Sequence, residues 1–120
     1  MEFNHFLTSY MPNVNIGSKV HFENMLKESV LAEKCGYATV SIPEHHLINL
    51  LMMPSPLQMA VKIASITKKI NITTGIVVLP IHDMRTYAGE VTTADILTDG
   101  RLILGAVSYT HLTLPTTNSV

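Results

Sequence analysis

The stretch of sequence that decides the fold is residues 70–79, which read INITTGIVVL. The run is nearly continuous in apolar and β-branched residues, and Pro80 closes it. Strands covered on both faces have this character, whereas strands with one wet face alternate apolar and polar residues. The stretch therefore predicts a buried strand of a parallel sheet.

Outward from this strand, helical and extended patterns alternate. Residues 55–69 predict a helix before it, with Pro56 at the first helical position, and residues 83–99 predict a helix after it. Further elements are predicted as strands at 2–8, 37–42 and 102–106 and as a helix at 18–35. The order β-α-β-α-β-α-β with short connections predicts a parallel sheet with right-handed crossovers.

Two architectures fit this order, an open doubly wound sheet and a (β/α)8 barrel. A doubly wound dinucleotide site has a G-x-G turn after its first strand, but residues 9–13 read SYMPN. A complete barrel takes about 250 residues, and this chain has 120. We therefore predict an α/β fold that comprises the first four strands of a truncated TIM barrel, in sequence order, with the helices on one face. Its open edge strands predict that the isolated chain is unfolded, oligomeric or aggregation-prone.

The composition argues against several classes of protein. The formal net charge is -1 and the eight Lys and Arg residues form no cluster, whereas nucleic-acid binders need a basic face. No apolar run reaches the roughly 18 residues of a membrane span, and the start lacks the basic segment of a signal peptide. Cys35 is the single cysteine, which fits a reducing compartment. We expect a cytoplasmic protein without nucleic-acid or membrane partners.

The last residues depart from the pattern of the rest. Residues 107–120 contain no Asp, Glu, Lys or Arg, and they are rich in Thr and contain Pro115 where a helix would be expected. Residues 107–117, VSYTHLTLPTT, resemble the translation of a sequencing adapter. We therefore expect a partial barrel domain at 1–106 and a non-native tail at 107–120.

Three consecutive polar residues mark a candidate site. Glu44, His45 and His46 follow the strand at 37–42, at the end of the sheet where barrel active sites collect. Imidazoles titrate near neutral pH and suit acid–base catalysis, although composition alone favours a solvated loop. A zinc site is disfavoured, because adjacent side chains diverge and His82, on another loop, is the only nearby partner.

Two further positions are candidates for contact with a ligand. Gly75 interrupts a β-branched strand, and such a glycine marks either a close backbone approach or tight packing in the barrel lumen. Thr8 ends the first predicted strand, so that its hydroxyl either faces the barrel mouth or satisfies a local backbone group.

Residues 1–106 resemble the N-terminal part of the bacterial luciferase-like flavin monooxygenases. Four segments in the same order and spacing carry the resemblance: residues 1–10, MEFNHFLTSY; 32–46, AEKCGYATVSIPEHH; 71–80, NITTGIVVLP; and 95–105, DILTDGRLILG. The resemblance implies a (β/α)8 barrel that binds reduced FMN, or a related flavin such as the deazaflavin coenzyme F420. It also implies insertion of one oxygen atom of O2 into a small organic substrate, a partner flavin reductase and a dimeric whole protein.

The resemblance also implies roles for particular residues. His45 matches the first His of the family's E-H-H motif, which lies beside the reactive edge of the flavin, so it would act as base or proton donor. Glu44 would assist this catalysis by orienting an imidazole. The Gly75–Ile76 bond matches a non-prolyl cis peptide that faces the flavin ring. Thr8 has no such match, and its position in the strand alone makes it a candidate for cofactor contact at the barrel mouth.

One departure from the family pattern concerns the flavin phosphate. The family has an Arg just after the fourth strand, and Ser108 stands at that place here. Because the chain lacks this Arg and comprises only half of a barrel, we expect the isolated chain to be inactive. Two alternatives remain open, a non-catalytic flavin-binding relative and a half-barrel that self-associates without enzymatic activity.

Overall fold

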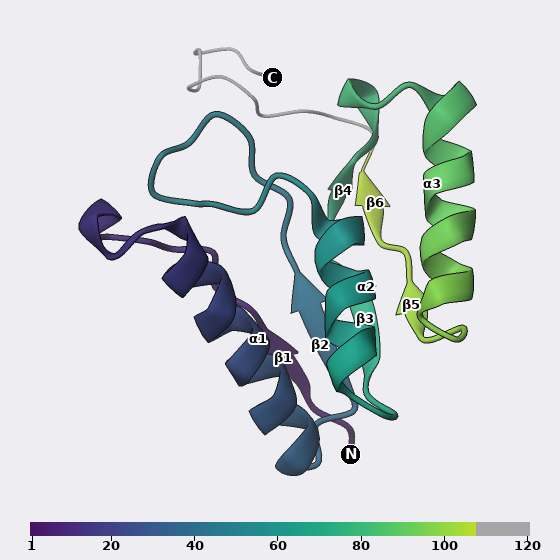
Figure 1. Cartoon of the computed structure of the whole chain (residues 1–120). Helices are drawn as coiled ribbons and strands as arrows, with labels where there is room; N and C mark the ends of the chain where they lie inside the picture. Colours follow the sequence, from purple (N-terminus) through teal and green to yellow (C-terminus); the bar gives the residue numbers. More distant parts are fainter. Residues whose placement is uncertain (108–120) are drawn as a thin grey trace.

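The computed structural model describes residues 1–107 of the chain (Figure 1). Its helices are α1 (Ser18–Lys34), α2 (Pro56–Ile66) and α3 (Met84–Leu97), with short 3-10 helices η1 (Val14–Ile16) and η2 (Leu79–Ile81). Its strands are β1 (Asn4–Phe6), β2 (Thr39–Ile42), β3 (Asn71–Thr74), β4 (Val77–Val78), β5 (Leu102–Ile103) and β6 (Ala106–Val107). Within the described residues, no helix is both long and apolar enough to cross a membrane.

A parallel sheet forms the centre of the fold. Its strand order is β1-β2-β3-β5, which follows the sequence as predicted. Figure 1 shows α1 and α2 in front of the strands, and α2 contacts both α1 and α3. The predicted arrangement, with the helices on one face of a partial barrel, is confirmed.

The main core lies between the sheet and the helices. Val40 and Ile42 of β2 and Ile72 of β3 are fully buried there against residues of α1 and α2. Successive side chains of a strand point to opposite faces, so Phe6 and Ile103 belong to the other, concave face, where 53% and 48% of their surfaces are exposed. The concave face is the one that a complete barrel would enclose as its lumen.

Two of the predicted strands, at 70–79 and 102–106, are each divided, which the sequence did not predict. The run at 70–79 forms β3 and β4, and the run at 102–106 forms β5 and the first residue of β6. Beyond Gly75 the N–H of Val77 donates to the carbonyl of Gly105 at 2.8 Å, and β4 pairs with β6 in a separate two-stranded sheet. A Cβ on Gly105 would lie 2.5 Å from the carbonyl oxygen of Thr74, so the two backbones approach as closely as they do because Gly105 has no side chain.

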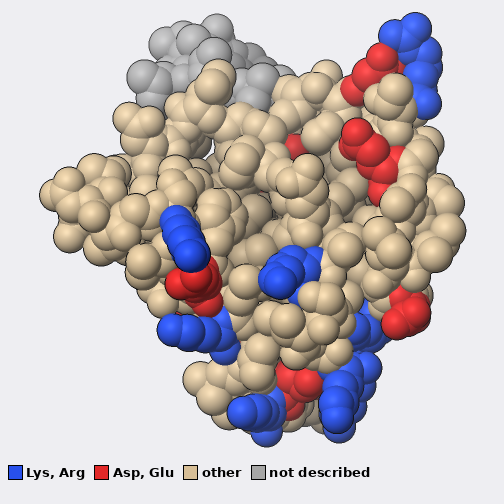
Figure 2. Space-filling model, in the orientation of Figure 1, with Lys and Arg blue, Asp and Glu red and all other residues tan. Residues whose placement is uncertain are grey.

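At the opposite end of the sheet, Arg101 connects α2 to the strands. Its guanidinium donates hydrogen bonds to the carbonyls of Ala64 at 2.7 Å and Ile70 at 3.1 Å, and to the hydroxyl of Thr67 at 3.0 Å. A cation at a helix C-terminus interacts favourably with the unpaired carbonyls of the last turn. Figure 2 shows that most Lys and Arg side chains on this face gather at the same lower end, mixed with acidic ones.

Candidate functional site

The loop between β2 and α2 lies at the C-terminal end of the strands and folds back onto the segment after β1. The N–H of Met52 donates to the carbonyl of Ser9 at 2.9 Å, and the N–H of Met11 donates to the carbonyl of Leu50 at 2.7 Å. Within the loop, the N–H of His45 donates to the carbonyl of Met53 at 2.8 Å. These contacts give the E-H-H segment a defined backbone position at the end where barrel sites form.

The carboxylate of Glu44 is the centre of this end of the molecule. Its side chain has no exposed surface, and Oε1 accepts hydrogen bonds from Nε2 of His46 at 2.8 Å and Nε2 of His82 at 2.6 Å. Oε2 accepts a hydrogen bond from the backbone N–H of Val78 at 2.7 Å. Glu44 therefore contacts two imidazoles, as an orienting residue should, but these belong to His46 and His82.

His82 is the residue of this cluster that sequence reasoning considered only as a metal ligand. It lies at the end of η2, and its ring stacks on Tyr87 of α3 with centroids 4.1 Å apart and planes 25° apart. Burial, together with the charges of Glu44 and Glu90, raises the pKa of Tyr87 to about 12. Within residues 1–107, no three His, Cys, Asp or Glu side chains are arranged to hold a metal ion.

The imidazole of His45 is half-buried beside this cluster. Burial lowers the pKa of His45 below its ordinary 6.5, because the charged form loses hydration, and the charge of His46 lowers it further. His45 is therefore neutral at pH 7, and a neutral imidazole has one nitrogen free to accept a proton. This is the protonation state that a general base requires.

We expect His45 to titrate with a midpoint below 6.5 in the whole protein, followed through its imidazole C–H resonances by NMR. His46→Gln removes the imidazole that lowers the pKa of His45 while retaining an amide that can donate to Glu44, so it should raise that pKa. A midpoint at or above 6.5 in the unsubstituted protein would contradict the burial of this imidazole.

The Gly75–Ile76 peptide lies at the same end of the sheet, and its bond is cis, as expected. A Cβ on Gly75 would lie 3.5 Å from Cβ of Ser41 and 4.0 Å from the ring of Phe6. Ser41 in turn donates a hydrogen bond to the amide oxygen of Asn4 at 3.0 Å. Gly75 is thus on the concave face, where its missing side chain leaves the backbone open to a flat ligand.

Thr8 follows β1 at this end and is exposed. Its hydroxyl accepts a hydrogen bond from the N–H of Tyr10 at 3.1 Å, which is the local backbone role considered for it. A contact between Thr8 and a cofactor stays a prediction, and Ser108, where the family has an Arg, lies outside the described residues.

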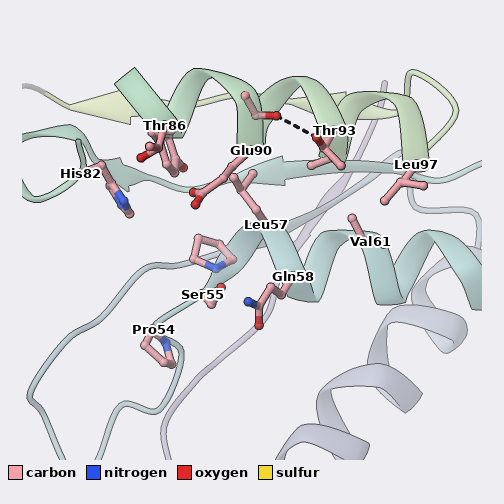
Figure 3. Close-up of a pocket in the computed structure, with 14 residues that line it drawn as sticks. Pro54, Ser55, Leu57, Gln58, Val61, His82, Thr86, Glu90, Thr93 and Leu97 are labelled. Carbon is pink, nitrogen blue, oxygen red and sulfur yellow. Dashed lines mark hydrogen bonds between the residues drawn. The ribbon is translucent and has the colours of Figure 1, made fainter. Parts of the chain in front are cut away.

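A cavity lies between α2 and α3 on the helical side of the sheet (Figure 3). Its volume is about 760 Å³, and its lining includes Leu57 and Val61 of α2 and Glu90 and Leu97 of α3. It includes neither His45 nor Gly75. His82 and Tyr87 also line the groove, which therefore borders the cluster around Glu44 and is a second candidate site beside the concave face.

The structure is thus part of a TIM barrel, with the cluster around Glu44 and the Gly75–Ile76 peptide at the C-terminal ends of its strands. Residues 1–111 match the luciferase-like monooxygenase family, and the chain belongs to this family. The chain is similar to the alkanal monooxygenase alpha chain of Photorhabdus laumondii, with 30% identity over 105 residues. That match covers 88% of this chain and 29% of the relative.

Two further proteins are similar to this chain. The oxygenase component of the flavin-dependent trigonelline monooxygenase of Acinetobacter baylyi is 31% identical over 84 residues, which are 70% of this chain and 23% of the relative. The oxygenating constituent of 3,6-diketocamphane monooxygenase from Pseudomonas putida, solved in complex with FMN, has the same fold. Its TM-score is 0.85 at 22% identity, over 92% of this chain and 30% of that one. The matches thus cover 23–30% of the length of these three proteins.

The described residues fit the ring system of a flavin. The concave face offers a planar glycine peptide flanked by Ser41 and Phe6, and a half-buried neutral imidazole lies at the same end of the strands. A flat aromatic ring needs such an open backbone surface, because a branched side chain at that place would occupy its volume.

Proposed function

We propose that this chain forms the N-terminal wall of a flavin-dependent monooxygenase, whose whole protein oxygenates a small organic substrate. The observation that carries the proposal is the placement of Gly75–Ile76 on the concave face, at the same end of the strands as the half-buried His45. Membership of the luciferase-like family supports the reaction class.

In this proposal the residues of the chain hold and shield the reacting groups. A bound reduced flavin supplies two electrons, so that one oxygen atom of O2 enters the substrate and the other leaves as water. The Gly75–Ile76 peptide supports the flavin ring, and Thr8 contacts the cofactor at the barrel mouth. His45 accepts or returns a proton at its free ring nitrogen, as its lowered pKa allows.

The finer assignments belong to the same proposal. We assign FMN as the cofactor in preference to coenzyme F420, and the FMN complex of the similar Pseudomonas putida protein supports this choice. The name of the Acinetobacter baylyi relative, an oxygenase component, supports a separate flavin reductase as partner. We further propose a dimeric, cytoplasmic whole protein. In this chain we assign residues 1–106 to the partial barrel domain and residues 107–120 to a non-native tail, whose first residue, Val107, pairs with Val78 of β4.

Labelled oxygen tests this function directly. The whole protein is supplied with 18O2, reduced FMN or reduced F420, and a panel of aldehydes, ketones and N-heterocyclic acids, and products are analysed by mass spectrometry. We expect one substrate class to gain one 18O atom with reduced FMN. Flavin binding without label in any product would favour the non-catalytic relative, and a dimer that binds no flavin would favour the self-associating half-barrel.

A further inference from the structure

The Gly75–Ile76 peptide lies where the regular pairing of β2 with β3 ends. The last backbone hydrogen bond between the two strands runs from the N–H of Gly75 to the carbonyl of Ile42 at 2.7 Å. The next residue after β2 is Pro43, which has no N–H to donate. Beyond the peptide, the N–H of Val78 donates instead to the side chain of Glu44, also at 2.7 Å. Hydrogen bonds donated to Ile42 and Glu44, at the end of β2, thus flank the Gly75–Ile76 peptide both before and after it.

The other oxygen of Glu44 is held by two imidazoles from different parts of the chain. His46 donates from the same loop and His82 from the end of η2, both to Oε1. A carboxylate has no hydrogen to donate, so both imidazoles must carry a hydrogen on Nε2. The carboxylate of Glu44 is fully buried, and burial of an unpaired charge is energetically costly. The three hydrogen-bond donors offset this cost.

We propose that Glu44, His46 and His82 form a latch that positions the Gly75–Ile76 peptide relative to His45. His45 lies between two residues of the latch in sequence, so the latch links the proposed proton-transfer residue to the proposed flavin support. Because both oxygens of Glu44 are engaged by the latch, Glu44 is a positioning residue. The stacking of His82 on Tyr87 extends the latch to the first turns of α3. The inference rests on the proposed function in that it assigns the flavin to this peptide.

Two substitutions in the whole protein, Glu44→Ala and Glu44→Gln, distinguish the loss of the latch from a general loss of stability. The alanine variant loses all three hydrogen bonds, and we expect its FMN dissociation constant to rise about tenfold or more. The glutamine variant can restore all three, because its amide oxygen can accept from Val78 and its NH2 group can donate to both imidazoles. This rescue requires both imidazoles to move their hydrogen to Nδ1, which 15N NMR detects.

Two control variants complete the design. Arg101→Met removes the hydrogen bonds at the opposite end of the sheet, so it should lower the melting temperature without changing the FMN dissociation constant of the folded protein. Glu90→Gln changes an exposed acid of α3 that lines the groove of Figure 3. This variant should change neither the melting temperature nor the FMN dissociation constant. If Glu44→Ala does not fold, His82→Ala takes its place, with a smaller expected loss of affinity.

The latch is overturned if Glu44→Ala, or His82→Ala in its place, binds FMN as tightly as the unsubstituted protein. It is also overturned if Glu44→Gln loses as much affinity as the alanine variant, or if 15N NMR finds neutral His46 and His82 with their hydrogen on Nδ1. If the unsubstituted protein binds no flavin, the proposed function fails. Two other measurements then test the latch. His46 and His82 should carry their hydrogen on Nε2, and the Val78 amide should exchange its hydrogen slowly, at a rate that Glu44→Ala increases.

Discussion

Substitution of His45 by Ala should slow oxygenation in the whole protein by about 10²–10⁴-fold, the usual loss when a general acid or base is removed. The FMN dissociation constant should change far less, because the surface proposed to support the ring is the backbone of Gly75–Ile76. Stopped-flow measurement of product formation, set beside a flavin titration, checks both expectations. The effect should therefore appear in kcat rather than in the binding of the cofactor.

His5 supplies a matched control for this substitution. It is another partly exposed histidine, but it faces the helices, where its Nε2 lies 3.4 Å from the carboxylate of Glu28. His5→Ala should leave turnover unchanged. Turnover of His45→Ala equal to that of the unsubstituted protein would remove His45 from the mechanism.

Substitution of Gly75 by Leu should weaken FMN binding by about 10–100-fold. A Cβ at this position makes an ordinary contact with Ser41 at 3.5 Å, so the first carbon fits. The remaining carbons of a leucine must extend into the concave space that we assign to the flavin ring. Gly89→Leu is the matched control, because Gly89 lies on α3, where an added Cβ would meet no atom within 4 Å.

Much of the fold could be predicted from the sequence, because buried parallel strands have a distinctive composition. The β-branched run at 70–79 placed β3 at the centre of the sheet, and Asp83 marked the start of α3, where its carboxylate accepts a hydrogen bond from the N–H of Arg85. Gly75 was also recognised from sequence as a special backbone position. Local propensity carried each of these predictions.

The division of these strands could not be predicted, because it depends on a change in pairing. β3 pairs with β2 on one side and with β5 on the other, whereas β4 pairs with β6 in a separate two-stranded sheet. The sequence on either side of Gly75 is equally β-branched, so nothing local indicates this change. The close approach of Gly105 to Thr74 is likewise a tertiary contact.

The position of the candidate site, at the C-terminal ends of the strands, could be predicted from the sequence. Its full set of residues could not. Glu44 and His45 were recognised because they follow a strand in a family-like motif, but the contact of His82 with Glu44 joins residues 38 positions apart. A pattern of charges in the sequence gives no signal for such a pair. One available signal was the position of His82 just after the central strand, since loops that follow parallel strands meet at the same end of the sheet.

A comparison of the FMN dissociation constants of Gly75→Leu and Gly89→Leu, by fluorescence quenching in the whole protein, decides which of the two candidate sites holds the flavin. A flavin held on the concave face predicts a clear loss of affinity for Gly75→Leu and unchanged affinity for Gly89→Leu, which lies in the lining of the groove between α2 and α3. Unchanged affinity for Gly75→Leu, with a loss for Gly89→Leu, would place the flavin in that groove and contradict the account.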